Sequence, residues 1–380
     1  MCVKVRTELL LSGSKDTVVS NLVPNPIRGR KWNPRRAVQE AEAALRHTDI
    51  GGKVQQSRVG LGLSSGKPVW SKAGPTERRK LVVEQVRRQE EVVRCTKAVA
   101  QAKQGQWMNW ESVEKRKISW RDLWSMEEGR IKFLIGATYD VLPSPQNLKQ
   151  WVDGDPSCPL CSETATLRHI MSGCKISLSQ GRYTWRHNQV LKSLAAGIES
   201  RRVQVNSGGN RLESAAIQFV REGEKCRGGR FLGRHESGRL RGANDWEMRV
   251  DLGGKLVVPQ EIVSTNLRPD LVLWSTSQQR AYFIELTVPW EDSVEEAYER
   301  KKLKYADLAA EAEQRGWKAR VCPVEVGCRG FIARSTLSLL GELGIGGRSL
   351  QQVINQLSEE ALKGSQWIWL RRNDVSWGPK

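Results

Sequence analysis

Apolar residues recur with two different periods along this chain, a helical one through the first half and a strand-like one near the end. Residues 76–105 place apolar side chains on one helical face opposite a mostly charged face, and Thr76 can cap the start. This pattern predicts an amphipathic helix. The same spacing predicts further helices at 120–137, 188–201 and 211–221.

The last 130 residues have a different pattern. Short runs rich in β-branched, aromatic and other apolar residues predict strands at 256–263, 271–274, 282–288 and 319–326. A helix is expected over 292–314, between the last two strands, and another over 335–343. This order of elements predicts an α/β module with a small mixed sheet.

Tryptophan is frequent around the second predicted helix, at positions Trp107, Trp110, Trp120 and Trp124. Large aromatic side chains contribute much of the buried area of a core. We therefore expect these four to anchor the core, and stacking on nucleic-acid bases is the alternative.

Positive charge is concentrated in one part of the chain. The net charge is +19 over 380 residues, yet residues 251–380 hold 17 basic and 17 acidic residues, so the whole excess lies in the preceding part. A basic body beside a neutral module predicts a polyanionic partner, and we favour nucleic acid over a basic surface without a partner. Residues 223–242 are rich in Gly and Arg, which predicts a linker that can also contact phosphates.

Eight cysteines are present, and five of them are scattered, at Cys2, Cys95, Cys226, Cys322 and Cys328. This scatter does not form the framework of a small secreted fold and indicates a reducing compartment. No apolar run reaches the length of a membrane span, and the run at 9–11 is too short for a secretory signal. We expect a soluble intracellular protein that does not associate with a membrane.

The other three cysteines form a motif with a histidine. Its spacing is Cys-x2-Cys-x7-His-x4-Cys, built from Cys158, Cys161, His169 and Cys174. Four such ligands suit tetrahedral zinc and leave no position for water, so the zinc is predicted to be structural. Chance clustering of unbound thiols is the alternative.

Two acidic residues stand out among the predicted strands. Asp270 opens one strand, and Glu285 lies between Ile284 and Leu286 in the next. A hairpin turn near 275–280 would place these strands side by side, so that both carboxylates could share a magnesium ion. A carboxylate within an apolar strand is costly to bury and needs an explanation; a salt bridge, for instance to Arg268, is the alternative.

The helix predicted after Glu285 supplies lysines. On a helical wheel Lys301 falls in the middle of the inward face, with Lys302 and Lys304 on its flanks. A lysine on a buried face is expected to meet an acidic partner. We predict Lys301 as the catalytic lysine, with Lys304 second; extension of Lys301 to solvent is the alternative.

Basic and aromatic residues also alternate just after the zinc motif. Such a pattern can hold phosphates and stack on unpaired bases, although packing of a helix start on the motif is an equal alternative. The nucleic-acid-binding residues predicted from the sequence are Arg182, Trp185, Arg186, His187, Arg227, Arg230 and Arg268.

Together these residues resemble the C-terminal part of the polyproteins of early-branching, often site-specific non-LTR retrotransposons. In that family a Cys-Cys-His-Cys knuckle precedes a restriction-like endonuclease of the PD-(D/E)xK superfamily. Cys158, Cys161, His169 and Cys174 match the knuckle, and Arg268-Pro269-Asp270 with Glu285 match the acidic motif. The lysine position two residues after Glu285 holds Thr287, so the resemblance implies a lysine displaced onto the following helix.

The resemblance implies that one strand of target DNA in the nucleus is nicked, which primes reverse transcription of the element's RNA. It implies structural zinc, catalytic magnesium, DNA as partner and the element's RNA as a further candidate. The chain departs from the family because it contains no Tyr/Phe-x-Asp-Asp motif, so no reverse transcriptase activity is expected. A truncated copy and a fragment of a longer element protein both remain open.

The predicted organisation has five parts. They are a basic, largely disordered arm at 1–75, a helical thumb-like connector at 76–150, the knuckle with its following helix at 151–200, a basic linker at 201–250, and an α/β restriction-like endonuclease domain at 251–380. A non-catalytic nucleic-acid-binding protein from a decayed or repurposed element is the main alternative function, and a purely structural protein is the third. The sequence does not indicate an oligomeric state.

Overall fold

The computed structural model describes residues 74–116, 118–208 and 238–378. The chain divides into two units, 1–97 and 98–380. Nearly all of the described part of the first unit is one helix, α6 (Pro75–Val99). The helix predicted over 76–105 therefore ends early, and the 3-10 helix η1 (Ala102–Asn109) follows it.

The second unit is built on a mixed four-stranded sheet in the order β1 (Trp246–Val250), β2 (Leu271–Ser275), β3 (Arg280–Thr287) and β4 (Lys318–Glu325). The first two pairings are antiparallel and β3 pairs parallel to β4. All of β2 and six central residues of β3 are buried, which explains why both strands are mostly apolar, with Glu285 as the charged exception. The predicted hairpin is confirmed, since Ser275 pairs with Arg280.

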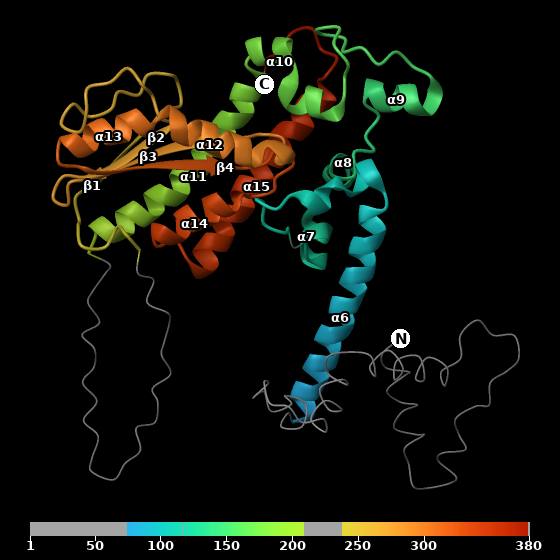
Figure 1. The fold of residues 1–380 in the computed structure, drawn as a ribbon, viewed down its shortest axis with the longest axis horizontal. Coiled ribbons are helices and arrows are strands. Elements are labelled where there is room, and N and C mark those ends of the chain that lie inside the picture. Colours follow the sequence, from blue (N-terminus) through green and yellow to red (C-terminus); the bar gives the residue numbers. More distant parts are fainter. Residues whose placement is uncertain (1–73, 117, 209–237, 379–380) are drawn as a thin grey trace, which may run out of the picture. The chain divides into compact units, whose positions relative to one another are not determined.

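Helices cover both faces of the sheet (Figure 1). On one face α12 (Val294–Lys304) and α13 (Ala306–Gln314) form the crossover between β3 and β4. On the other face lie α11 (Arg182–Asn206), α14 (Arg334–Glu342) and α15 (Gly347–Leu370). Side chains alternate accordingly along β3: Phe283 packs in the cluster of Tyr305 and Leu308, whereas Ile284 packs in the cluster of α11 and α15.

Short helices precede α11 in the chain. They are α7 (Trp120–Ser125), α8 (Glu128–Thr138), α9 (Pro145–Val152), the π-helical turn η2 (His169–Gly173) and α10 (Lys175–Ser179). The helix predicted over 120–137 is thus two helices, because Met126 has an extended backbone. Ser119 and Asp122 form a capping box that defines the start of α7.

One predicted strand is wrong. Residues 256–263 are apolar because Leu256, Val258, Ile262 and Val263 are buried beneath the α13 face, but their backbone forms a loop with a turn at Pro259. The first strand is instead β1, which comes from the segment predicted as linker. An apolar run shows that side chains are buried and does not by itself identify a strand.

Two helix predictions also change. The helix expected over 292–314 is interrupted at Tyr305, whose hydroxyl donates a hydrogen bond to the carbonyl of Arg268 at 2.9 Å. Helix α15 was not predicted, although Val353, Leu357 and Ala361 recur at helical spacing and are buried. The helix over 335–343 is confirmed as α14.

The tryptophans behave differently from expectation. Trp107 and Trp110 are half-buried and make edge-to-face contacts with Tyr139 and Phe331. Trp120 and Trp124 are 78% and 86% exposed, so the prediction that they anchor the core is wrong. They lie four residues apart and therefore share one face of α7.

Several predictions fall outside the described residues. These are the basic arm as far as residue 73, the helix at 211–221, and residues 223–237 of the Gly/Arg-rich segment with Arg227 and Arg230. Within the described part of the chain, no helix has both the length and the apolarity needed to cross a membrane.

Candidate functional site

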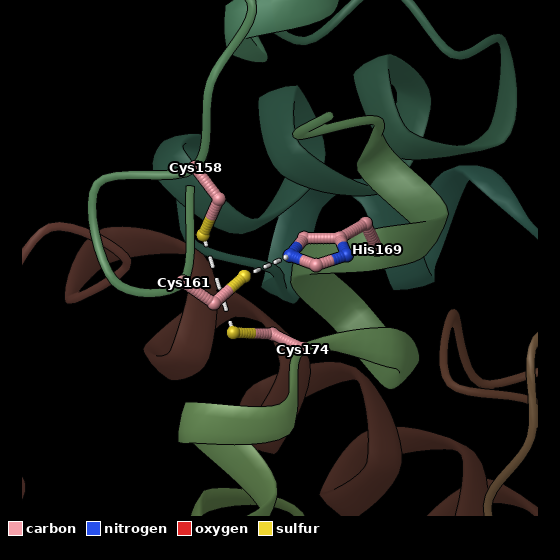
Figure 2. A group of neighbouring side chains, drawn as sticks. All are labelled: Cys158, Cys161, His169 and Cys174. Carbon is pink, nitrogen blue, oxygen red and sulfur yellow. Dashed lines mark hydrogen bonds between the residues drawn. The ribbon is translucent and has the colours of Figure 1, made fainter. Parts of the chain in front are cut away.

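The four residues of the Cys/His motif converge on one point (Figure 2). Their ligand atoms all lie within 4.8 Å of one another. Cys158 Sγ is 4.0 Å from Cys174 Sγ, and Cys161 Sγ is 3.2 Å from His169 Nε2. A tetrahedral zinc site has ligand-to-ligand distances of about 3.5–3.8 Å, so these four side chains could hold zinc with small adjustments.

Local backbone geometry brings the ligands together. Cys158 and Cys161 lie on a tight turn in which Ser162 N–H donates to the carbonyl of Cys158 at 2.8 Å, and Ser162 has a positive φ of 62°. His169 begins the turn η2, and Cys174 follows its end. Glu163 Oε2 lies 3.8 Å from His169 Nδ1, on the side of the ring away from the sulfurs. A carboxylate in this position orients a metal-binding histidine.

The start of α11 holds this knuckle in place. Tyr183 Oη accepts a hydrogen bond from Cys174 N–H at 3.1 Å and lies 3.1 and 3.0 Å from the carbonyls of His169 and Ile170. Burial raises the pKa of Tyr183 to about 12, so the hydroxyl keeps its proton for these carbonyls. Tyr183 thus joins α11 to the knuckle through hydrogen bonds to the backbone of the knuckle.

A second group of polar side chains lies where β2 begins and β3 ends. Glu285 Oε2 accepts a hydrogen bond from the backbone N–H of Asp270 at 3.1 Å, and Asp270 Oδ2 accepts one from Leu286 N–H at 2.7 Å. The antiparallel pairing of β2 with β3 produces this proximity, because it brings the start of one strand to the end of the other. The Glu285 side chain is only 5% exposed.

Lysines from α12 approach the same carboxylate. Lys301 Nζ donates to Glu285 Oε1 at 2.6 Å, and Lys304 Nζ lies 3.7 Å from the same oxygen. Lys304 also donates to Tyr305 Oη at 2.9 Å. Lys302 is turned away and lies 3.9 Å from Glu299. Of the three lysines considered from the sequence, the structure brings Lys301 and Lys304 to the acidic pair.

Burial and the nearby carboxylates of Glu285 and Asp270 raise the pKa of Tyr305. The phenol therefore remains a hydrogen-bond donor and holds the loop carbonyl of Arg268. We define Asp270, Glu285, Lys301, Lys304 and Tyr305 as the acidic cluster.

A histidine that the sequence assigned to nucleic-acid binding belongs beside this cluster instead. His187 Nε2 is 3.2 Å from Asp270 Oδ2 and 3.3 Å from the carbonyl of Leu286. Burial is the largest single effect and opposes a charge on the ring. The hydrogen bond to Asp270, the charge of Asp270 and the oxygens of Asn188 and Leu286 together outweigh it, so the pKa of His187 is raised. No sequence signal links positions 187 and 270, because their contact depends on how α11 crosses the end of the sheet.

Two predicted nucleic-acid contacts are wrong. Arg182 and Arg186 are 0% and 1% exposed, so neither guanidinium can reach a phosphate backbone. Arg182 donates to the carbonyls of Arg371 and Asp374, and Arg186 donates to those of Met171 and Val288. Their physical role is to bind backbone carbonyls of segments that are distant in sequence, which gives the buried guanidinium groups hydrogen-bond acceptors.

The remaining predicted contacts differ in exposure. Trp185 is half-buried and makes an edge-to-face contact with Trp377 at 5.7 Å between ring centroids. Arg268 is exposed and donates to the carbonyl of Gly254 rather than to Glu285. Among the residues predicted to bind nucleic acid that the structure describes, Arg268 alone is exposed.

Fold and sites together define the class: an α/β protein with a Cys3His cluster and a mixed four-stranded sheet flanked by helices. Comparison with protein-family models and with curated proteins finds no match for the chain. Any further assignment therefore depends on the chemistry of the two groups of side chains described above.

Proposed function

We propose that this chain is a magnesium-dependent DNA endonuclease of the restriction-like type, belonging to a non-LTR retrotransposon. The observation that supports it most is the meeting of Asp270, Glu285 and Lys301 at one end of the sheet. Asp270 immediately precedes β2, Glu285 lies in β3 and Lys301 lies in α12. The two carboxylates are fifteen residues apart in the sequence. A buried carboxylate held by a lysine beside a second carboxylate is a costly arrangement, which function explains better than stability does.

The donor set suits a hard divalent cation. Magnesium prefers oxygen ligands and is commonly held by one or two carboxylates together with waters, which Asp270 and Glu285 can provide. When bound, such an ion activates water and offsets charge on the scissile phosphate. Lys301 lies close enough to Glu285 to contact the same water or phosphate oxygen, and we assign it the role of catalytic lysine, with Lys304 as second candidate.

The wider role follows from the resemblance of the motifs. Nicking of one target DNA strand in the nucleus would provide the primer for reverse transcription of the element's RNA, carried out by a polymerase that this chain does not supply. The knuckle, with structural zinc, and basic surface residues such as Arg268 would position the duplex.

The exposed face of α7 favours a second candidate function. Trp120 and Trp124 expose most of their ring surface, and aromatic rings of this kind stack on unpaired bases. A zinc-knuckle protein that binds nucleic acid without cutting it, from a decayed or repurposed element, would use this face and would not need the acidic cluster.

Cleavage of supercoiled plasmid separates the two functions. We expect the purified chain to convert supercoiled plasmid to the open circle in magnesium but not in a chelator. Asp270→Asn and Glu285→Gln should each lower the rate about 100-fold or more, because loss of a metal ligand removes several kcal/mol of transition-state stabilisation.

Glu299→Gln is the matched control, since Glu299 lies on the same helix as Lys301 and is exposed. Its nicking rate should equal that of the starting protein. Salt-dependent DNA binding without nicking, in magnesium or manganese, would contradict the endonuclease and support the second candidate.

A further inference from the structure

His187 lies within hydrogen-bonding distance of Asp270 in the acidic cluster. It projects from the second turn of α11, and its side chain is 23% exposed. Its Nε2 approaches two oxygens, Asp270 Oδ2 at 3.2 Å and Leu286 O at 3.3 Å. Both are acceptors, so Nε2 carries a proton and donates it.

The two carboxylate oxygens of Asp270 differ in their hydrogen bonds. Oδ2 receives the N–H of Leu286 and the Nε2–H of His187, which come from different elements. Two donors on one oxygen fix the rotation of the carboxylate. Oδ1 receives no hydrogen bond that the described residues supply, so it is the oxygen left to bind a cation.

We propose that His187 is a positioning residue that orients Asp270 for the divalent ion. The inference rests on the proposed function, because it concerns the same carboxylate. Partners of this kind, which bind a metal-holding carboxylate or histidine without touching the metal, set metal affinity by about 10–100-fold. This role differs from the nucleic-acid contact that the sequence predicts for His187.

The position of His187 is itself well supported. Asn188 Oδ1 lies 3.2 Å from His187 Nδ1. Arg186, the preceding residue, ties α11 to the segment after β3 through the carbonyl of Val288 at 3.2 Å. Tyr183, one turn before His187, is bound to the knuckle backbone. The helix therefore has little freedom to move its sixth residue away from Asp270.

Manganese binding to the zinc-loaded chain tests the proposal without relying on cleavage. Titration by calorimetry should give one site that Asp270→Asn removes. His187→Ala should weaken manganese binding about tenfold. His187→Gln, which keeps a neutral N–H donor of similar reach, should recover most of this loss.

Steady-state kinetics of DNA cleavage test the role of His187 in a second way. In His187→Ala, KM for DNA should stay unchanged and a higher manganese concentration should restore kcat, as expected of a residue that acts through Asp270. Lys192→Ala is the matched control, because Lys192 is an exposed cation on the same helix. It should leave manganese affinity unchanged.

The outcomes separate the role of His187 from the endonuclease activity itself. Unchanged manganese affinity in His187→Ala, with Asp270→Asn still abolishing binding, overturns the role of His187 and leaves the endonuclease proposal standing. A raised KM for DNA at unchanged metal affinity also overturns it and restores the phosphate contact. Equal manganese binding by the starting protein and Asp270→Asn overturns the proposed function and the inference together.

Discussion

Buried carboxylates carry most of the chemical information at the scale of single residues. Glu285 is 4% exposed but has a lysine and a backbone N–H as partners. Glu325, the last residue of β4, is fully buried. Its Oε2 accepts a hydrogen bond from Ser335, and Oε1 has no partner among the described residues. The two residues lie on the same face of adjacent strands. Among the described residues, a cation pairs with Glu285 and none with Glu325.

Glu325 leads to a prediction about pH. Burial raises the pKa of Glu325 from 4.5 to about 7. The folded protein therefore binds this proton more tightly than the unfolded chain, so stability is greatest below the unfolded pKa and falls as pH rises through the folded one. Glu325→Gln should remove this loss and raise the free energy of unfolding at pH 8 by roughly 2–3 kcal/mol.

Urea unfolding at pH 5 and pH 8 measures this difference. The variant should exceed the starting protein in stability by much less at pH 5, just above the unfolded pKa, than at pH 8. A variant that is less stable at both values would contradict the account, because it would show that the carboxylate is compensated in the folded state.

Part of this residue-scale picture could be predicted from sequence. An acidic residue between Ile284 and Leu286 signals a buried carboxylate, and the wheel position of Lys301 correctly indicated which lysine meets it. The roles of Arg182, Arg186 and His187 could not be predicted. Residues 182–187 form the start of one helix, and the sequence does not show that Arg182 and Arg186 are buried whereas His187 is half-buried. Their partners, such as Asp374 and Asp270, are distant in sequence.

At the scale of elements, α11 connects the two groups of functional side chains. Its first turn is bonded to the knuckle through Tyr183, and its second reaches Asp270 through His187. The periodicity at 188–201 predicted the middle of this helix but not its start at Arg182. The missing turns are polar because their side chains bind backbone carbonyls, which an apolar periodicity cannot reveal.

Removal of zinc should therefore affect more than the knuckle. The chain should bind one zinc ion, and chelation or Cys174→Ser should remove it. The backbone amides of residues 156–174 should then exchange faster, because closed Cys3His sites contribute folding energy directly. Protection in the first two turns of α11 should fall as well, because Tyr183 loses its partners.

Hydrogen exchange with mass spectrometry measures both changes in one experiment. Peptides from β2 and β3 provide the internal control and should keep their protection, because both strands are buried. Unchanged exchange in α11 after complete zinc loss would show that the knuckle does not support this helix.

At the scale of the whole molecule, the order of elements was predicted better than their boundaries. The mixed sheet, its hairpin and the crossover after β3 follow from the apolar runs and the turn between them. The loop at 256–263 was predicted as a strand, whereas strand β1 was predicted as part of a linker. Strand β1 was missed because it is short and only its first residue is buried. The first part of the chain is basic and the last part is neutral. That the basic part binds nucleic acid remains a prediction.

Binding of DNA should depend steeply on salt. Replacing Arg227 and Arg230 together by Ala should reduce the slope of log affinity against log salt by about 1 for each phosphate that is no longer neutralised. Arg182→Met should instead lower stability and leave the slope unchanged, since its side chain is buried. Fluorescence anisotropy with an Asp270→Asn background, which prevents cleavage, gives these slopes; equal slopes for all variants would contradict an electrostatic role for 223–242.

Anomalous diffraction from crystals of the chain soaked in manganese would locate the divalent ion at Asp270 and Glu285. We expect a peak within about 2.1 Å of a carboxylate oxygen of both Asp270 and Glu285, with Lys301 beside it. A manganese peak bound elsewhere, or no peak at this end of the sheet while Lys301 keeps its ion pair with Glu285, would contradict this expectation.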